Sequence, residues 1–164
     1  MKRDYTQRFG FLVNDVAKLY GEQFDRLARE RIGLSLAQCR LLSTLAMHGE
    51  ELKPLSQVEL SQRMDLSAMG VAGLCDRMAA AGWIRRTPNP TDRRVNEIRL
   101  EPEAEKALDA ALVVGDALTG RVLSALTEEE AAQLIGLLGK VRINLQKLMN
   151  AGGATLKPVQ VPAE

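Results

Sequence analysis

The sequence predicts a mainly α-helical fold with one small β-hairpin. Apolar residues recur every three or four positions near both ends of the 164-residue chain, which is typical of amphipathic helices. Capping residues precede several of these runs. Two prolines, Pro88 and Pro90, interrupt the chain between two short β-prone runs and exclude a helix there. The length predicts one domain, or one domain with a helical extension.

Long helices are expected at both ends of the chain. The first should run from about Thr6 to Arg31 and end at Gly33. Its apolar face is formed by Phe9, Val13, Val16, Tyr20, Phe24 and Leu27. A helix opened by Pro102 should reach about Ala125. A capping box at Thr127 and Glu130 then opens the last helix, whose stripe is Leu134, Leu137, Leu138, Val141, Leu145 and Leu148.

The central segment, residues 34–101, carries the most specific pattern. Capping boxes at Ser35 with Gln38 and at Ser56 with Glu59 predict two helices, which end near His48 and Met64. After a turn at Asp65-Leu66, Ser67 opens a third helix that ends at Gly82, where Trp83 should fold back on Met78. Its buried stripe is Val71, Leu74, Cys75 and Met78. Strands at Ile84–Thr87 and Asn96–Leu100 complete the hairpin.

A helix, a tight turn, a second helix and a hairpin in this order predict a winged helix-turn-helix, a device for reading double-stranded DNA. We therefore divide the chain into a dimerisation helix (1–33), a DNA-binding domain (34–101), C-terminal dimerisation helices (102–150) and a disordered tail (151–164). The terminal helices are too long to bury their apolar faces against the small domain alone, which favours packing against a second copy. A monomeric helical bundle is the alternative.

The outer face of the third helix is the candidate DNA-reading surface. It presents Ser67, Met69, Gly70, Ala72, Gly73, Asp76 and Arg77. Its first turn has no Asn, Gln or Arg for bidentate base contacts, so we expect it to read DNA shape and thymine methyl groups through Met69 and Ala72. Arg77 would hold a phosphate, and Asp76 would orient Arg77 or a neighbouring basic group. The two glycines indicate either close approach to DNA or close packing against another helix.

Four arginines lie on the hairpin. Arg85 and Arg86 could flank the DNA backbone, whereas Arg93 and Arg94 at the tip could enter the minor groove with Asp92 as a brace. Residues 53–100 carry 8 basic and 5 acidic side chains, whereas residues 101–164 carry 6 and 9. Positive charge is thus concentrated on the expected DNA-binding domain. A solvated charged loop is the alternative for the hairpin.

Several functional classes are excluded by composition. One His and two Cys, Cys39 and Cys75, do not supply an ordinary zinc site, and both thiols fit small buried hydrophobes. The chain has no nucleophile with an evident base and no glycine-rich phosphate loop, so we expect no enzyme, cofactor or metal. No apolar run reaches 18 residues and the N-terminus lacks a signal-peptide pattern, which predicts no membrane partner and a cytoplasmic protein.

Together these residues resemble the MarR (multiple antibiotic resistance regulator) family of bacterial transcription factors. The most specific match is AAAGWIRRTPNPTDRRVNEIRL, residues 79–100, which contains the family's D-x-R pair as Asp92 and Arg94. The segment Leu74–Met78 fits the family's Leu-x-Asp-Arg-Leu pattern, with Arg77 as the matching arginine. The chain departs from the family after the second strand, where Leu100-Glu101-Pro102 stands. It has no cysteine in the first helix, so thiol sensing is not expected.

The resemblance implies a two-fold homodimer that binds a palindromic operator, acts as a repressor and is released by a small aromatic or amphipathic effector. It also places the effector cleft where the first, second and fifth helices meet the winged domain. Candidates there are Tyr20, Phe24, Arg40 and His48. Arg40 could pair with a ligand carboxylate or be solvated, and His48 could simply cap helix carbonyls. The alternative functions are a sequence-tolerant architectural DNA binder and a winged-helix module that binds protein.

Overall fold

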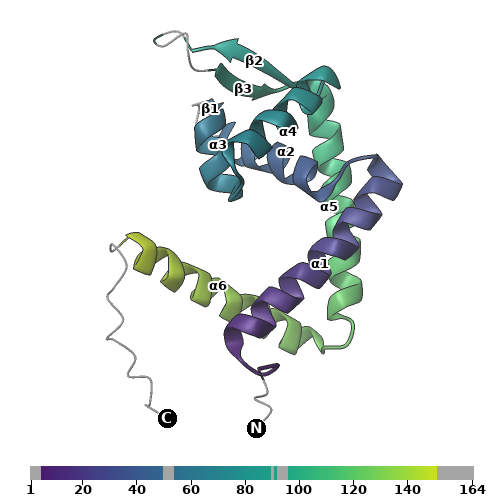
Figure 1. Cartoon of the computed structure of the whole chain (residues 1–164). Helices are drawn as coiled ribbons and strands as arrows, with labels where there is room; N and C mark the ends of the chain where they lie inside the picture. Colours follow the sequence, from purple (N-terminus) through teal and green to yellow (C-terminus); the bar gives the residue numbers. More distant parts are fainter. Residues whose placement is uncertain (1–4, 50–53, 90, 92–95, 151–164) are drawn as a thin grey trace. The chain divides into compact units, whose positions relative to one another are not determined.

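The computed structural model describes residues 5–49, 54–89, 91 and 96–150. The chain divides into two compact units, Met1–Thr119 and Gly120–Glu164. The expected tail, residues 151–164, lies outside the described residues. Along the chain the elements are α1 (Phe9–Ile32), α2 (Leu36–Gly49), β1 (Leu55–Ser56), α3 (Gln57–Met64), α4 (Ala68–Ala80), β2 (Ile84–Pro88), β3 (Asn96–Leu100), α5 (Pro102–Leu123) and α6 (Glu128–Asn150) (Figure 1).

This mainly helical architecture with a small sheet confirms the predicted fold class. The helix boundaries differ from the expected ones at two ends. α1 begins at Phe9 rather than Thr6, and its N-cap residue, Arg8, forms no capping bond through its side chain. α5 ends at Leu123 rather than Ala125. Both differences lie at helix ends, which are the least predictable part of a helix.

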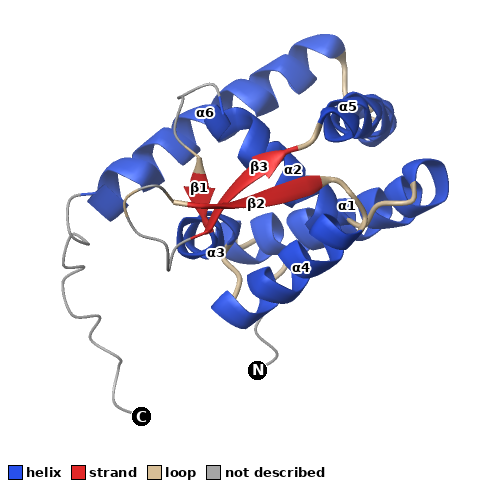
Figure 2. Cartoon of the chain, turned by 90° about the horizontal axis from the view of Figure 1, so that it is seen from above, coloured by secondary structure: helices blue, strands red, loops and turns tan. Residues whose placement is uncertain are grey.

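The sheet has a third strand that the sequence analysis did not predict. Its order is β1-β3-β2 and all pairings are antiparallel, so β3 lies in the middle (Figure 2). Leu55 pairs with Ile98 and Ser56 with Glu97, while β2 pairs with β3 from Ile84 opposite Leu100 to Pro88 opposite Asn96. A strand of two residues is too short to show an alternating pattern, so only the fold reveals it.

The core of the first unit lies between α2, α3, α4 and the sheet. Its fully buried side chains include Leu41, Leu42, Leu55, Leu60, Met64, Val71, Cys75, Met78 and Ile98. The predicted stripe of α4 is confirmed, because Val71, Leu74, Cys75 and Met78 are all buried. Each side chain of this size contributes roughly 1.5–3 kcal/mol on burial. The stripe therefore fixes which face of α4 turns inward and leaves the opposite face for solvent or a partner.

Helix ends follow the capping signals closely. Ser35, Ser56 and Ser67 each accept a hydrogen bond from a backbone N–H three residues on, at 3.3, 3.2 and 3.1 Å. After α4, Gly82 has φ +77°. The Trp83 N–H donates to the Met78 carbonyl, and the Gly82 N–H donates to the Ala79 carbonyl, both at 3.0 Å. This Schellman motif is the predicted fold-back of Trp83, and it aims the chain into β2.

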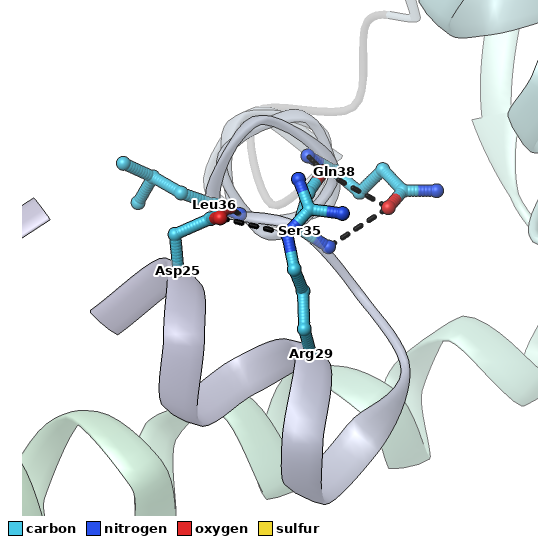
Figure 3. A network of polar contacts seen from close by, with 5 residues as sticks. All are labelled: Asp25, Arg29, Ser35, Leu36 and Gln38. Carbon is cyan, nitrogen blue, oxygen red and sulfur yellow. Dashed lines mark hydrogen bonds and ion pairs between the residues drawn. The ribbon is translucent and has the colours of Figure 1, made fainter. Parts of the chain in front are cut away.

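A contact that sequence reasoning missed joins α1 to α2. An oxygen of Asp25 accepts a hydrogen bond from the Leu36 N–H at 2.7 Å, and the other oxygen accepts one from Arg29 Nε at 2.7 Å (Figure 3). The Arg29 guanidinium and the Leu36 amide hold the pKa of the Asp25 carboxyl below its ordinary value. Asp25 thus caps a helix that begins 11 positions further on, beside the Ser35 capping box.

The predicted apolar face of α1 is only partly covered within the first unit. Tyr20, Phe24 and Leu27 are half-buried, whereas Phe9, Val13 and Val16 are exposed. In the second unit, α6 has no buried residue at all. Among the described residues, no single helix is both long enough and apolar enough to cross a membrane.

Candidate nucleic-acid interface

The turn between α3 and α4 sets the orientation of the predicted reading helix. Asp65 follows α3 in the left-handed conformation, at φ +52° and ψ +47°, and its N–H donates to the Ser61 carbonyl. The Leu66 N–H donates to the same carbonyl at 3.1 Å. Ser67 then caps α4 through the Gly70 N–H. With the apolar stripe of α4 held in the core, its opposite face is presented outward, and the Met69 side chain is 85% exposed.

Of the two glycines of α4, Gly73 is not explained by packing within the chain, whereas Gly70 lies close to the hydroxyl that caps the helix. A methyl group added at Gly73 would meet only the Arg77 guanidinium, at 3.6 Å, which is ordinary contact. One added at Gly70 would meet the Ser67 hydroxyl at 3.2 Å. No other helix of the described part of the chain approaches either position. Packing against another helix of this chain therefore does not account for Gly73, and close approach of this helix to DNA stays a prediction.

Arg86 ties the hairpin to α4. Its Nη2 atom lies 2.6 Å from Asp76 Oδ1 and donates to the Ala72 carbonyl at 3.4 Å. The Arg86 side chain is only 29% exposed, because this strand position faces α4 rather than solvent. The neighbouring basic group that Asp76 orients is therefore Arg86, and the pair fixes the position of β2 against the reading helix.

The other predicted DNA contacts have different surroundings. The Arg85 side chain is 60% exposed and its Nε lies 3.7 Å from Glu101 Oε1. Arg77 is exposed and forms no ion pair with any described residue. Ala72 is half-buried and Ser67 is exposed beside the helix start. Asp92, Arg93 and Arg94 lie outside the described residues. The described interface thus combines an apolar helix face with two outward arginines.

A cavity of roughly 410 Å³ lies in the first unit between α1, α2 and α5. Three of the four predicted effector residues line it: Tyr20, Phe24 and Arg40. His48 is not a lining residue and is buried near the end of α2. The Tyr20 hydroxyl lies 3.0 Å from Thr119 Oγ1 and donates to the Gly115 carbonyl at 3.4 Å. Apolar walls come from Leu36, Met47, Leu108, Ala111 and Leu112.

The α5 wall of this cavity was missed by the sequence analysis. Asp116 and Thr119 both line it, three residues apart on one face of an otherwise apolar helix stretch. These two polar residues on an apolar stretch were the sequence feature from which this cavity wall could have been predicted. Cys39 lines the cavity too, and burial together with the Asp25 carboxylate raises the pKa of its thiol. Burial also raises the pKa of Cys75. Both thiols are therefore held protonated, as expected for buried structural cysteines.

Comparison with known proteins identifies the family. A profile of the MarR family matches residues 32–95. The HTH-type transcriptional repressor MdtR of Bacillus subtilis (strain 168) is 33% identical over 112 residues, which cover 68% of this chain and 70% of MdtR. The chain belongs to the MarR family.

Two solved structures agree with this fold. Apo MarR from E. coli matches with a TM-score of 0.74 at 24% identity, covering 81% of this chain and 96% of that one. CouR from Rhodococcus jostii RHA1, crystallised bound to p-coumaroyl-CoA, matches with a TM-score of 0.66 at 23% identity, covering 85% and 95%. The winged helix-turn-helix prediction is therefore confirmed.

Membership of the MarR family decides the class of function. The chain is a transcriptional regulator with a DNA-binding winged helix, and the prediction that it is not an enzyme is confirmed by the repressor to which it is related. Among the described residues, no cluster of three or more His, Cys, Asp or Glu side chains could hold a metal ion. In this MarR-family chain the α3–α4 pair and the β2–β3 hairpin are the helix-turn-helix and its wing.

Proposed function

We propose that this MarR-family regulator is a homodimeric repressor that binds a palindromic operator and is released by a small amphipathic effector. The observation that carries the proposal is the outer face of α4, where Met69 is 85% exposed opposite a fully buried stripe. A helix face that is apolar, glycine-containing and unpacked suits the floor of a major groove, where Met69 and Ala72 meet thymine methyl groups. Arg77, Arg85 and the wing arginines then contact phosphates or the minor groove.

The dimer is supported by large apolar side chains that are exposed on α1 and on α6. Phe9 and Val16 of α1 are 60% and 54% exposed, and Leu137 and Leu145 of α6 are 51% and 52% exposed. Helices with such stripes are stable only when the stripe is buried against another surface. A second copy supplies that surface with two-fold symmetry. In this proposal residues 1–33 and 102–150 form the dimer and residues 34–101 bind DNA.

The effector is proposed to occupy the cavity between α1, α2 and α5. Its apolar walls suit an aromatic or aliphatic body, Arg40 suits an anionic group, and Asp116 suits a hydroxyl or amine that donates a hydrogen bond. The match to CouR, which was crystallised with p-coumaroyl-CoA, supports an aromatic acid or its thioester as the class of ligand. Repression is proposed by analogy with MdtR, and a cytoplasmic location follows from action on DNA.

The test is selection of bound sequences from a random duplex pool, followed by a salt titration on the selected duplex. A palindromic consensus with half-sites about 10 bp apart is expected, because two symmetry-related helices enter successive major grooves. Affinity should fall by orders of magnitude between about 50 and 200 mM salt. Steep salt dependence without a consensus would indicate an architectural DNA binder. Absence of binding at low salt would contradict the proposal of a repressor. A winged-helix module that binds protein would then remain as the alternative function.

A further inference from the structure

Arg40 links the cavity to the helix-turn-helix. It lies on α2 and lines the cavity, yet its Nη2 atom donates to the backbone carbonyl of Met64 at 3.3 Å. Met64 is the last residue of α3, which is the first helix of the helix-turn-helix. One residue therefore lines the proposed effector site and contacts the end of α3.

The Met64 carbonyl lies at the end of α3, immediately before the turn that leads into α4. Carbonyls in the last turn of a helix have no partner within the helix and need one from elsewhere. Asp65 follows immediately in the left-handed conformation, which costs a non-glycine residue about 1 kcal/mol. Only Asp65 and Leu66 separate this carbonyl from Ser67, the cap of α4. The direction in which α4 leaves the turn thus depends on how the end of α3 is held.

An anion in the cavity would compete for this guanidinium. The bond to Met64 is long, at 3.3 Å, and its acceptor is a neutral carbonyl. A carboxylate forms bonds of about 2.7–2.9 Å with arginine that are roughly twice as strong. Because Arg40 is exposed and on a flexible stem, it can turn towards such an anion without disturbing the core.

We propose that Arg40 is a positioning residue through which the cavity controls the reading helix. With the cavity empty, Arg40 holds the end of α3 and keeps the turn and α4 in the DNA-binding arrangement. An anionic group in the cavity draws the guanidinium away from Met64, loosens the turn and weakens DNA binding. This inference rests on the proposed function for the location of the effector, and it adds the route by which the effector acts.

The experiment measures binding of a fluorescent duplex and amide hydrogen exchange in peptides covering residues 61–70 of the full chain. Arg40→Met removes the donor and keeps the apolar stem. It should weaken DNA binding about tenfold and speed exchange at the turn, while the unfolding midpoint of the protein stays nearly constant. Arg40→Lys retains a charged donor and should restore part of the affinity. Lys106→Met, an equal charge change at an exposed position of α5 outside the cavity, should bind DNA like the wild type.

Sodium benzoate is the probe for competition. It should weaken DNA binding and speed exchange at the turn in the wild type, and have no further effect on Arg40→Met. Arg40→Met that binds DNA and exchanges like the wild type would overturn the inference, as would an equal benzoate response in both proteins. If Arg40→Met behaves as expected but benzoate leaves the wild type unchanged, the positioning role stands and the proposed effector chemistry is wrong.

Discussion

At the scale of single residues, a substitution at Gly73 should change folding stability and DNA affinity in opposite directions. A methyl group fits at this position in the free chain, so glycine is kept there at a cost to helix stability. We expect Gly73→Ala to raise the free energy of unfolding by up to about 1 kcal/mol and to weaken DNA binding at least tenfold, since the added methyl would stand between helix and DNA. Urea unfolding and duplex binding measure the two effects.

Gly120→Ala is the matched control, because a methyl group there also meets nothing within 4 Å and the position lies on α5. It should stabilise the helix without changing DNA affinity. If Gly73→Ala bound DNA as tightly as the wild type, the helix backbone would not approach the groove closely, and the glycine would have no functional explanation here.

Neutralising Asp76 should change DNA affinity in opposite directions, depending on whether its carboxylate repels phosphates or holds Arg86. A solvated carboxylate on the DNA-facing surface repels phosphates, so neutralising it would tighten binding. Because Asp76 instead holds Arg86, we expect Asp76→Asn to weaken DNA binding several-fold by loosening the wing from α4. Stability should change by less than about 1 kcal/mol, as for other partly exposed ion pairs. Fluorescence anisotropy on one duplex measures the affinity.

The charge-swapped protein, Asp76→Arg with Arg86→Asp, is the companion variant. It restores the ion pair with the two charges exchanged. If this ion pair holds the wing in position for DNA, the variant should recover part of the lost affinity. Tighter binding by Asp76→Asn than by the wild type would mean that the acid acts only through repulsion, and that Arg86 is free to contact DNA itself.

At the scale of secondary-structure elements, the α1–α2 junction predicts a pH dependence. The folded pKa of Asp25 is lowered by Arg29 and the Leu36 amide. The resulting stabilisation is therefore complete above the unfolded value of about 3.9 and is lost as the pH falls below it. Asp25→Asn keeps an oxygen that can accept the Leu36 hydrogen bond but removes the charge.

The difference in unfolding free energy between wild type and Asp25→Asn should accordingly be constant from about pH 5 to 8 and shrink below about pH 4. Denaturant unfolding at several pH values measures it. Asp15→Asn, on an exposed position of the same helix, is the control and should show no such trend. A difference that persisted unchanged at pH 3 would show that the charge of Asp25 does not stabilise the junction.

The elements also show where sequence patterns are sufficient. Capping boxes at Ser35 and Ser56 need only residues three apart, and both formed as predicted. β1 was missed because Leu55 and Ser56 are a strand only by virtue of pairing with Ile98 and Glu97, more than 40 positions away along the sequence. Asp25 was missed for the same reason, since its partner amide belongs to the following helix.

At the scale of the whole molecule, the exposed stripe of α6 predicts that dimerisation is required for DNA binding. Leu138→Glu places a charge among Leu134, Leu145 and Leu148 on that stripe. We expect the variant to be monomeric at micromolar concentration, because an unpaired charge is costly in an apolar interface. DNA affinity should fall by orders of magnitude when one half-site is lost. Sedimentation velocity and duplex binding measure both.

Gln146→Glu adds the same charge on the side of α6 away from the stripe and should remain dimeric. A Leu138→Glu protein that stayed dimeric would show that α6 does not form the interface. A wild-type protein found as a monomer at micromolar concentration would remove the two-fold model altogether, and with it the expected spacing of the half-sites.

The sequence alone determined what depends on neighbouring residues. Capped helix starts and the glycine-ended α4 follow from patterns within about ten positions. So do the buried stripe of α4 and its exposed Met69 face, because helix geometry repeats every 3.6 residues. The tertiary structure decided what depends on distant residues. It turned Arg86 towards Asp76, placed Asp116 in the cavity wall and brought Arg40 to Met64. Such contacts arise only when packing brings distant elements together, and no local pattern records them.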